Sequence, residues 1–563
     1  MKFNMIKIKR LSGGLLTAAS VLFCSTLSLQ AQTQSKDTTL TRTVVVEQEY
    51  NPDIMDARKV NVLPRVEEIT VSPNAVQYDG AMAPAVNIPA ESMSAFAGKE
   101  VQPDPKQGYV RLGYGNNGNL DAKANYLFLL SARDKLNLSF AMDGMDGKLD
   151  MVNTDEKWNS YFYRTRAGLN YLHRFGKADL DIAGNFGLSN FNYLRALPLA
   201  RQKFTSGDVH LGVASTDDSF PLQFKLETNL LLYSQAFYAF DDKSSNESIV
   251  RTKASVSGEI SEGQKAGVAV EMNNLFYNNE LLENRTLLLL NPYYRWGNDV
   301  ANIHAGANVD LAFGYGKTFR VSPDISANYI FSDSYVLYAQ ATGGRRISDF
   351  RRYEMTSPYG LIDGQQEDGY EQFNARIGFK ASPVSGLWFN LHGGYQDIKN
   401  DLYHFFEPIY YPAESSYYPY ARTDRSLFYY TSNTNNMYAG LGIKYDYRDM
   451  VFVSVGGQYY NWDSDNNDAL LMKPEFKLDF QLGVRPISGL HVNLGYQYVQ
   501  RTKFKDYQEM NAINNLSLDF AYNVFDGVSI YAKASNLLNK SYSYYLTYPA
   551  QGINFLGGLS FRF

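Results

Sequence analysis

The last residues of the chain alternate between apolar and more polar positions and end on an aromatic side chain. A mostly apolar set occupies every second position: Phe555, Gly557, Leu559, Phe561 and Phe563. Because side chains of a β-strand point alternately to its two faces, one face of this strand suits an apolar medium. A chain that ends within a strand leaves an unpaired edge unless that strand closes onto another one. The pattern favours a closed barrel, and an edge strand of a soluble sandwich is the alternative.

The composition agrees with a barrel that spans a membrane. The 563 residues include 44 Tyr and 34 Phe, yet the mean hydropathy is only −0.34. Transmembrane barrels combine a lipid-facing apolar band and aromatic girdles with a polar lumen. Their sequences are therefore rich in aromatic residues and still have a low mean hydropathy. The net charge of −5 and the lack of a long basic run argue against a nucleic-acid partner.

The first 31 residues have the pattern of a signal peptide. Basic residues precede an apolar stretch from Leu15 to Leu29, and we place cleavage after Ala31. The single cysteine, Cys24, lies inside this stretch, and the bulky Phe23 before it disfavours a lipoprotein signal. The mature chain would then contain no cysteine and no disulfide. No later window is apolar enough for a helical membrane span.

The mature chain divides into two parts. Residues 32–105 contain seven prolines, which prevent long strands or helices, and we expect a periplasmic arm or a small insert in the lumen. Residues 106–563 are a succession of amphipathic strands. In one of them Phe476, Leu478 and Phe480 alternate with Lys477 and Asp479, as strands do between lipid and a watery lumen.

Ten tight-turn signals set the predicted number of strands. If both termini are periplasmic, ten short turns divide the barrel into eleven hairpins, and the sequence predicts 22 antiparallel strands, with an uncertainty of one hairpin around residues 400–430. The last strand would close against residues 107–115. The turn signals are Arg133-Asp134, Gly176-Lys177, Asp217-Asp218, Glu262-Gly263, Asn298-Asp299, Ser332-Asp333, Pro383–Gly386, Arg448-Asp449, Pro486–Gly489 and Asp526-Gly527.

Two long connections at the opposite, extracellular end are candidate ligand or partner contacts. Residues 349–370 carry Arg351 and Arg352. Residues 408–425 carry a tyrosine cluster that either stacks on sugar rings, contacts a partner protein, or continues an interfacial aromatic girdle. Arg345 and Arg346 either attract anionic solutes or are solvated charges at a strand end. The tyrosines of the cluster are Tyr410, Tyr411, Tyr417, Tyr418 and Tyr420.

The C-terminal segment resembles the end of TonB-dependent receptors. The resemblance rests on an Asn-Leu-x-Asn-Lys-x-Tyr motif at residues 536–542, on Tyr548-Pro549 with Gly552 after it, and on the terminal aromatic residue. It covers about thirty residues. It implies a 22-strand outer-membrane barrel, and it implies that Phe555, Leu559, Phe561 and Phe563 form the signal read by the outer-membrane assembly machinery.

The chain departs from that family before the barrel. The resemblance implies a globular plug of well over a hundred residues, whereas only the proline-rich arm precedes the first strand here, so the expected barrel has no full plug. The segment from Tyr50 to Val60 resembles the arm of plugless receptor-like barrels from Bacteroidota. A β-branched run within residues 41–46 is either a partner-binding strand, with TonB as one partner, or an ordinary extended segment. The candidate periplasmic docking residues are Val44, Val45, Val46, Tyr50 and Pro52.

Catalysis and cofactor binding find no support in the sequence. The six histidines lack the spacing of metal ligands, so we expect no metal, no cofactor and no enzyme activity. His173 and Ser189 lie on neighbouring predicted strands, but no local motif pairs them.

Two functions therefore remain open. The first is passage or binding of a small solute, with the arm as a partial stopper. The second is a structural or interaction role in a larger outer-membrane complex, such as assembly machinery or a surface-lipoprotein partner. Membrane lipid and other envelope proteins are partners in both.

Overall fold

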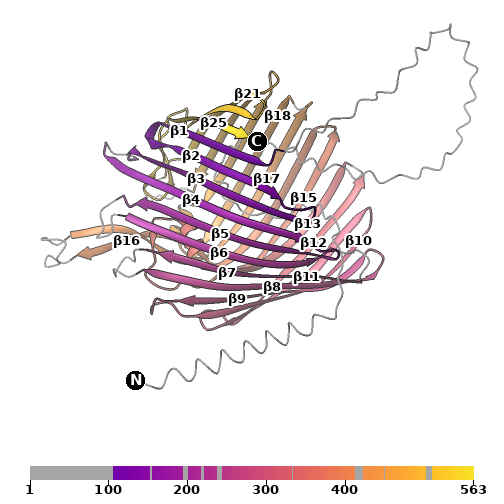
Figure 1. Cartoon of the computed structure of the whole chain (residues 1–563). Helices are drawn as coiled ribbons and strands as arrows, with labels where there is room; N and C mark the ends of the chain where they lie inside the picture. The colour runs from indigo at the N-terminus through magenta and orange to yellow at the C-terminus, as the bar shows by residue number, and fades with distance from the viewer. Residues whose placement is uncertain are drawn as a thin grey trace, which may run out of the picture.

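The computed structural model describes residues 106–563, apart from 153–154, 195–200, 217–220, 237–243, 333, 412–421, 449 and 503–509. Twenty-two antiparallel strands form one closed barrel, in which each strand pairs with its neighbours in the chain (Figure 1). The fold class and the strand number predicted from the sequence are confirmed. The barrel strands are β1 (Gly108–Gly115), β2 (Leu120–Leu129), β3 (Asp134–Asp150), β4 (Lys157–Arg174), β5 (Ala178–Asn192), β6 (Arg201–Ser215), β7 (Leu222–Gln235), β8 (Ser245–Ser261), β9 (Gln264–Tyr277), β10 (Arg285–Gly297), β11 (Ala301–Phe313), β12 (Phe319–Ser332), β13 (Tyr335–Arg346), β15 (Gly369–Val384), β16 (Leu387–Tyr411), β17 (Arg422–Tyr447), β18 (Val451–Ser464), β19 (Pro474–Val484), β20 (Leu490–Arg501), β21 (Ile513–Phe525), β22 (Val528–Ser535) and β25 (Asn554–Arg562).

The remaining elements lie in connections between these strands. The helix α2 (Phe350–Thr356) and the short strand β14 (Gly360–Leu361) belong to the connection between β13 and β15. The strands β23 (Ser543–Tyr545) and β24 (Tyr548–Pro549) pair with each other in the connection between β22 and β25. The 3₁₀ helices η2 (Asn116–Gly118) and η3 (Asn467–Leu470) complete the set. No helix among the described residues has the length and apolar character needed to cross a membrane.

The last strand closes the barrel onto the first one. In the register between β1 and β25, Leu112 lies opposite Leu559. The Gly108 N–H donates to the Phe563 carbonyl at 2.7 Å, and the Phe563 N–H donates back at 3.0 Å. The chain thus has no free strand edge at its C-terminus, as predicted from the alternation.

The lumenal side of this closure is tightly packed. The Arg111 guanidinium is buried and pairs with Asp121 at 2.6 Å, and it lies 5.2 Å from the Tyr531 ring centre. The Tyr531 ring fits over Gly113 and Gly558, since a Cβ atom at either glycine would come within 3.0 Å of it. Glycine is therefore required where the first and last strands meet.

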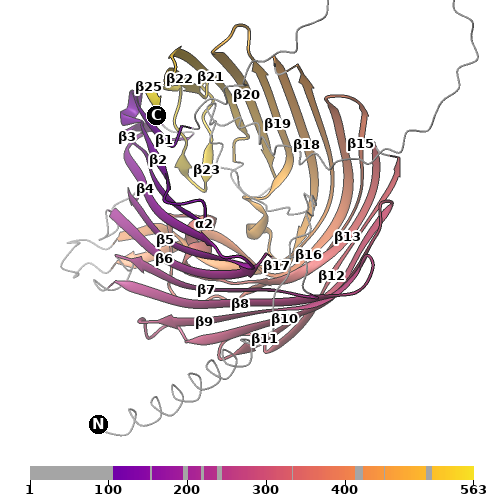
Figure 2. The same ribbon diagram turned by 45° about the vertical axis from the view of Figure 1, so that its right-hand side comes forward.

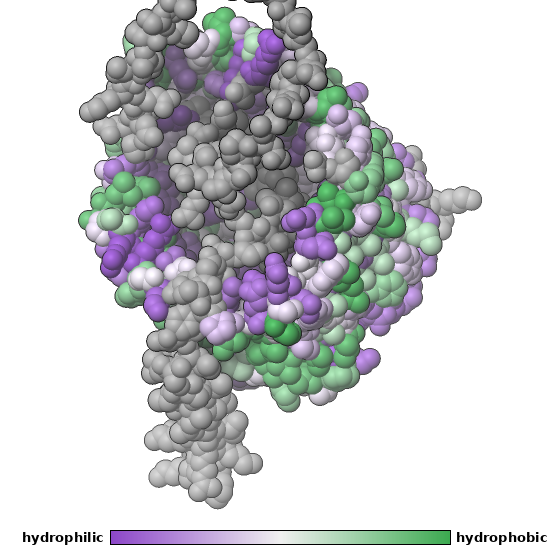
Figure 3. Space-filling model, turned by 90° about the vertical axis from the view of Figure 1, so that its right-hand side faces the viewer, coloured by the Kyte–Doolittle hydropathy of each residue, from purple (hydrophilic) through white to green (hydrophobic). Residues whose placement is uncertain are grey.

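The outer wall of the barrel is apolar and the inner wall is polar. Val209, Ile377, Leu391 and Phe555 point outward and are each more than half exposed. Hydrophilic residues gather around the central hollow, and hydrophobic ones gather on the outer wall (Figure 3). A closed antiparallel barrel with an apolar exterior is the β-structure that a bilayer accepts, because all backbone groups are paired. The protein lies in the outer membrane.

The predicted turns lie at junctions between consecutive strands, at the end of the barrel where both described chain ends lie, although Asp217, Asp218, Asp333 and Asp449 themselves lie outside the described residues. In outer-membrane barrels this end is periplasmic, and the longer connections are extracellular. The uncertain region near residues 400–430 is a single hairpin of two long strands, β16 with 25 residues and β17 with 26. This hairpin extends beyond the neighbouring strands (Figure 1). The predicted signal peptide and arm, residues 1–31 and 32–105, lie outside the described residues.

Candidate functional site

The barrel encloses a large cavity of about 3610 Å³. Its walls include residues of the periplasmic turns, such as Ser488 and Asp526, and residues of the extracellular connections, such as Arg351 and Tyr545. The cavity thus runs from the periplasmic end of the lumen to the inner side of the connections that fold into it. This volume is several times that of a typical pocket for a small-molecule ligand.

The connection between β13 and β15 folds into the lumen (Figure 2). Asp349 caps the N-terminus of α2, and its carboxylate accepts a hydrogen bond from the Arg352 N–H at 2.8 Å. The Phe350 N–H donates to the Glu247 carboxylate of β8 at 3.1 Å. Glu354, one turn later, accepts from the Ser189 hydroxyl of β5 at 2.7 Å. These contacts hold α2 against the inner wall formed by β5 to β8.

A core of aromatic residues joins this connection to the one between β22 and β25. Tyr359 stacks on Tyr548 with ring centres 3.6 Å apart, and the Trp158 ring of β4 contacts both. After Tyr359, β14 pairs in parallel with β17, with Leu361 opposite Phe428. The connection therefore crosses the lumen from the β13–β15 wall to the β4–β5 wall and to β17. The buried core narrows the extracellular end.

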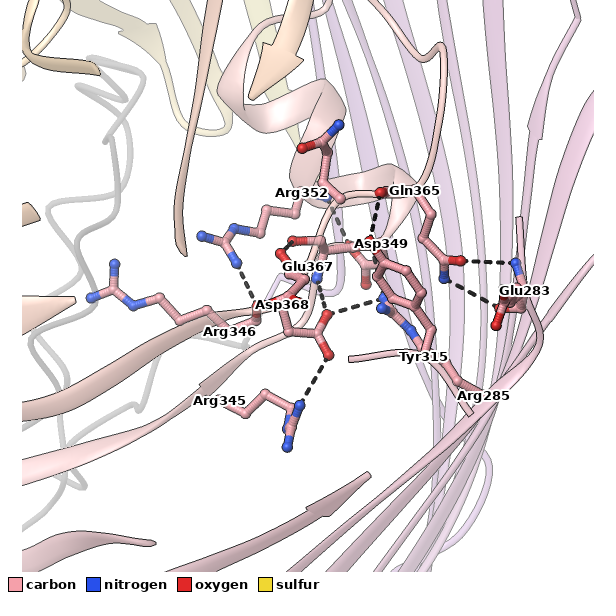
Figure 4. Close-up of polar contacts among 12 residues, drawn as sticks. Glu283, Arg285, Tyr315, Arg345, Arg346, Asp349, Arg352, Gln365, Glu367 and Asp368 are labelled. Carbon is pink, nitrogen blue, oxygen red and sulfur yellow. Dashed lines mark hydrogen bonds and ion pairs between the residues drawn. The ribbon is translucent and has the colours of Figure 1, made fainter. Parts of the chain in front are cut away.

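Asp368, directly before β15, attaches the end of the β13–β15 connection to the inner wall of the barrel (Figure 4). Its carboxylate lies 3.0 Å from the Arg285 guanidinium of β10 and 3.3 Å from the Arg345 guanidinium of β13, and all three side chains are buried. The Ser348 N–H also donates to it, at 2.8 Å. Gln365 adds a second attachment through two hydrogen bonds with the Glu283 backbone, at 2.8 and 3.2 Å. A buried ion pair with several hydrogen bonds is costly to break.

The connection between β22 and β25 contains the receptor-like motif. The Asn536 side chain is buried and donates to the carbonyls of Lys540 and Gln551, at 2.9 Å each. Asn536 and Asn539 have φ angles of 49° and 48°, in the left-handed region that asparagine tolerates. The motif therefore forms the first part of an inward-folded connection.

Basic side chains predominate along the cavity, although the whole chain is acidic. Fourteen Lys and Arg residues line it against seven Asp and Glu residues. Three of the cations, Arg346, Arg352 and Lys473, gather around the buried Asp401. A lumen with this balance attracts anions and repels cations.

Burial changes the ionisation of two groups in the β13–β15 connection. It raises the pKa of Asp349 above the ordinary value of 3.8, against the hydrogen bond from the Arg352 N–H and the nearby cations that favour the charged form. Burial also raises the pKa of Tyr359, so this hydroxyl stays neutral.

The candidate site residues fall into different places. Arg351 and Arg352 lie in α2 inside the lumen, and Phe555, Leu559, Phe561 and Phe563 lie on the outward face of β25 or directly after it. Their role as an assembly signal stays a prediction. Of the tyrosine cluster, Tyr410 and Tyr411 end β16. The following candidates lie outside the described residues: Tyr417, Tyr418, Tyr420, Val44, Val45, Val46, Tyr50 and Pro52.

The structure separates the two residues weighed for catalysis. His173 pairs with Asp134 at the periplasmic end, whereas Ser189 binds Glu354 beneath the extracellular connections. In the described parts of the chain, no three side chains of His, Cys, Asp or Glu gather as a metal site requires.

Sequence reasoning missed the inward fold of both connections. A usable signal was the density of large apolar residues in a segment too long for a turn, since a solvated loop has no need of them. Phe350, Tyr353, Tyr359 and Leu361 are all buried. The pairing of Asp368 with Arg285 joins residues that no local sequence pattern connects.

The comparisons with known proteins agree with this geometry. The siderophore receptor PirA from Acinetobacter baumannii has a TM-score of 0.63 at 10% sequence identity, over 82% of this chain and 81% of that one. The FrpB iron transporter from Neisseria meningitidis has a TM-score of 0.63 at 12% identity, over 82% of both chains. The copper transporter OprC has a TM-score of 0.56 at 13% identity, over 82% and 80%. No family model and no curated protein sequence matches the chain.

At these low identities the similarity establishes the fold. It confirms the coarse form of the resemblance, a receptor-type outer-membrane barrel of 22 strands. The absence of a plug and the Bacteroidota type stay predictions, because both concern the arm.

Proposed function

We propose that this barrel passes a small solute across the outer membrane, with the β13–β15 and β22–β25 connections as its extracellular gate. The proposal treats residues 32–105 as a partial stopper at the periplasmic end, in place of a full plug. No energy coupling through TonB is required for such a passage, and contact between residues 44–46 and TonB is a separate proposal.

One observation carries this proposal: the polar cavity continues from the periplasmic turns to the inner side of the inward-folded connections. A barrel with only a structural role has no need of a continuous polar lumen of this size. Wide barrels are normally plugged, and here the packed core around Tyr359 and Tyr548 supplies a barrier at one end. The receptor-type fold of the similar structures supports the same conclusion only by analogy.

Conductance in planar bilayers tests the proposal. The purified full chain is compared with a variant that lacks residues 32–105 and in which a short Gly-Ser linker replaces residues 350–366. We expect small or no currents from the full chain and large, stable currents from the variant. Silence from a variant that still migrates as a folded, heat-modifiable barrel would contradict a passage.

The long β16–β17 hairpin favours a second candidate function, a subunit that binds another envelope protein. Its strands of 25 and 26 residues extend past the neighbouring strands into the extracellular space. Such a projection presents an edge and a tip to a partner. Co-purification from native membranes tests this role: a stoichiometric partner that is lost when residues 405–428 are shortened would support it.

A further inference from the structure

We infer that the acidic stretch at residues 47–56 of the arm docks on the lumenal face of strands β15 to β19. This stretch contains four carboxylates and no cation, and the carboxylates are Glu47, Glu49, Asp53 and Asp56. The inference deepens the proposed function and rests on it in one respect, because it identifies the docked stretch with the stopper. The contact is an electrostatic one between two parts of the same chain.

Four cations lie on this face, which forms one side of the lumen (Figure 2). Ile377 is exposed on the outer wall, so the even-numbered residues around it in β15, among them Arg376 and Lys380, face the lumen. Lys444 of β17 and Lys477 of β19 line the cavity. Because neighbouring strands lie ~4.8 Å apart, the four charges are spread over about 19 Å of the wall.

Each of these cations lies over an aromatic ring of the same wall. The charged groups are between 4.9 and 6.0 Å from the ring centres. Such a position holds a long side chain against the wall without neutralising its charge. The rings belong to Tyr338, Trp388, Tyr438 and Tyr460.

Two carboxylates lie among the cations on these strands. Asp479 is exposed two residues after Lys477, and Glu475 accepts a hydrogen bond from the Gln500 amide at 2.9 Å. No ion pair joins Lys380 or Lys444 to a carboxylate in the part of the chain that the structure describes. The face therefore carries four cations and two carboxylates.

The carboxylates at the borders of this face do not restore the balance. Toward the extracellular end, Glu371 and Asp401 already pair with Arg346. Toward the periplasmic end, Asp446 lies next to the last residue of β17 and is exposed. A basic face in a confined lumen attracts an acidic segment.

The face is open toward the cavity. Gly456 of β18 lies opposite Gly442 of β17 on one side and opposite Asp479 of β19 on the other. A Cβ atom at Gly456 would meet no other atom within 4 Å. Nothing among the described residues thus covers the middle of the face, and a peptide segment has room there.

The arm is long enough to reach this wall. Lys106 is the first described residue, lines the cavity, and pairs with Asp526 at 2.7 Å at the periplasmic end. Fifty positions separate Lys106 from Asp56. An extended chain of that length spans roughly 170 Å, far more than the ~30 Å of a bilayer core.

The composition of the arm matches the wall. Residues 32–105 contain eleven Asp and Glu residues against six Lys and Arg residues. Charge-assisted hydrogen bonds between carboxylates and Lys or Arg are stronger than neutral ones. Tyr50 and Pro52 lie within the acidic stretch, and grooves lined with aromatic rings accept proline-containing segments.

Cysteine cross-linking in the purified full-length barrel tests the contact. Ile54→Cys is combined with Ser454→Cys on β18 or with Ser206→Cys on β6, two cavity-lining positions on opposite sides of the lumen (Figure 2). Both pairs are made with Cys24→Ser, because Cys24 is the one native cysteine. We expect a short bismaleimide to cross-link the pair with Ser454→Cys several-fold more, because docking raises the effective concentration there. High salt should reduce this preference.

Exchange of the charges separates a specific contact from a folding defect. Lys444→Glu with Lys477→Glu should abolish the preference, and further addition of Glu47→Lys with Glu49→Lys should restore it. Lys123→Glu with Arg166→Glu is the matched control, because both are cavity-lining cations on β2 and β4, and it should leave the preference unchanged. Heat-modifiable mobility in gels shows that each variant is folded.

Equal cross-linking at the two positions would overturn the inference, and so would a lack of cross-linking at both or a failure of the charge exchange. Cross-linking of the arm to a separate envelope protein instead of the wall would also overturn it. Conductance that rises on removal of residues 32–105, without the preferred cross-link, would support the passage and contradict this contact. A preferred cross-link in a barrel that stays silent after the removal would do the reverse.

Discussion

Tyr359 and Tyr548 stack face to face, with ring centres 3.6 Å apart and ring planes 6° apart. They belong to two connections that are remote in the sequence and that both fold into the lumen. Their contact joins these connections into one packed barrier at the extracellular end. Under the proposed function, the stability of that barrier determines whether the passage is closed or open.

Removal of one ring should loosen this barrier. In Tyr359→Ala we expect the docked state of the connection to lose about 3 kcal/mol, because a buried aromatic ring and its stacking partner are separated. Tyr359→Phe should lose much less, since the ring remains. Limited trypsin digestion measures the effect, because undocking exposes the bonds after Arg351 and Arg352. Equal protection in both variants would argue against the stack as the fastening point.

Loss of the buried carboxylate should free the other end of the same connection. Asp368→Asn leaves the buried Arg285 without its charged partner and leaves Arg345 only the more distant Asp310, and we expect a loss of roughly 3–5 kcal/mol. Asp363→Asn is the control, because Asp363 is an exposed carboxylate in the same connection. Thermal unfolding, followed by the shift in gel mobility, compares the two. A similar midpoint for both variants would mean that Asp368 is dispensable.

Docking of α2 should depend on pH through Asp349. Burial raises the pKa of this group in the folded protein above its ordinary value of 3.8. Its stabilising contribution is therefore complete below the unfolded pKa and is lost as the pH rises through the folded pKa. The negative charge of the neighbouring Glu247 disfavours ionisation of Asp349, whereas the positive charges of Arg251, Arg351 and Arg352 favour it.

The Asp349→Asn variant separates this charge effect from the helix cap, because asparagine still accepts the Arg352 N–H. We expect the protection of the wild type to fall as the pH rises above the ordinary Asp349 pKa of 3.8, and the protection of the variant to vary less over the same range. A wild-type barrel whose protection increases with pH would contradict the assignment.

Closure of the barrel should depend on Gly558 far more than on its neighbour. A Cβ atom at Gly558 would lie 2.2 Å from the Leu112 carbonyl oxygen, whereas at Gly557 the nearest atom is 3.7 Å away. We expect Gly558→Ala to reduce the amount of folded barrel in the outer membrane and Gly557→Ala to leave it nearly unchanged. Immunoblots of heated and unheated membranes distinguish the folded from the unfolded barrel in each variant. Equal amounts of folded barrel in Gly558→Ala and Gly557→Ala would refute the steric argument.

The sequence predicts the wall of this barrel much better than its interior. Alternation in segments such as residues 476–480 is a local property of a strand between lipid and water, so the strands, turns and closure can be found from it. The packing of the β13–β15 and β22–β25 connections depends on pairs such as Tyr359 with Tyr548 and Asp368 with Arg285. These residues are far apart in the sequence, and no local sequence pattern links them. Arg351 and Arg352 were identified as candidate contacts, but the place of Arg352 beside Asp401 required the fold.

In the proposed function, the β13–β15 connection closes the extracellular end of a passage. Single-channel conductance tests it most directly in two chains that both lack residues 32–105 and differ only in residues 350–366, native in one and replaced by a Gly-Ser linker in the other. We expect stable currents from the linker chain that are several-fold larger than those from the native one. Equal conductance of two folded barrels would contradict it.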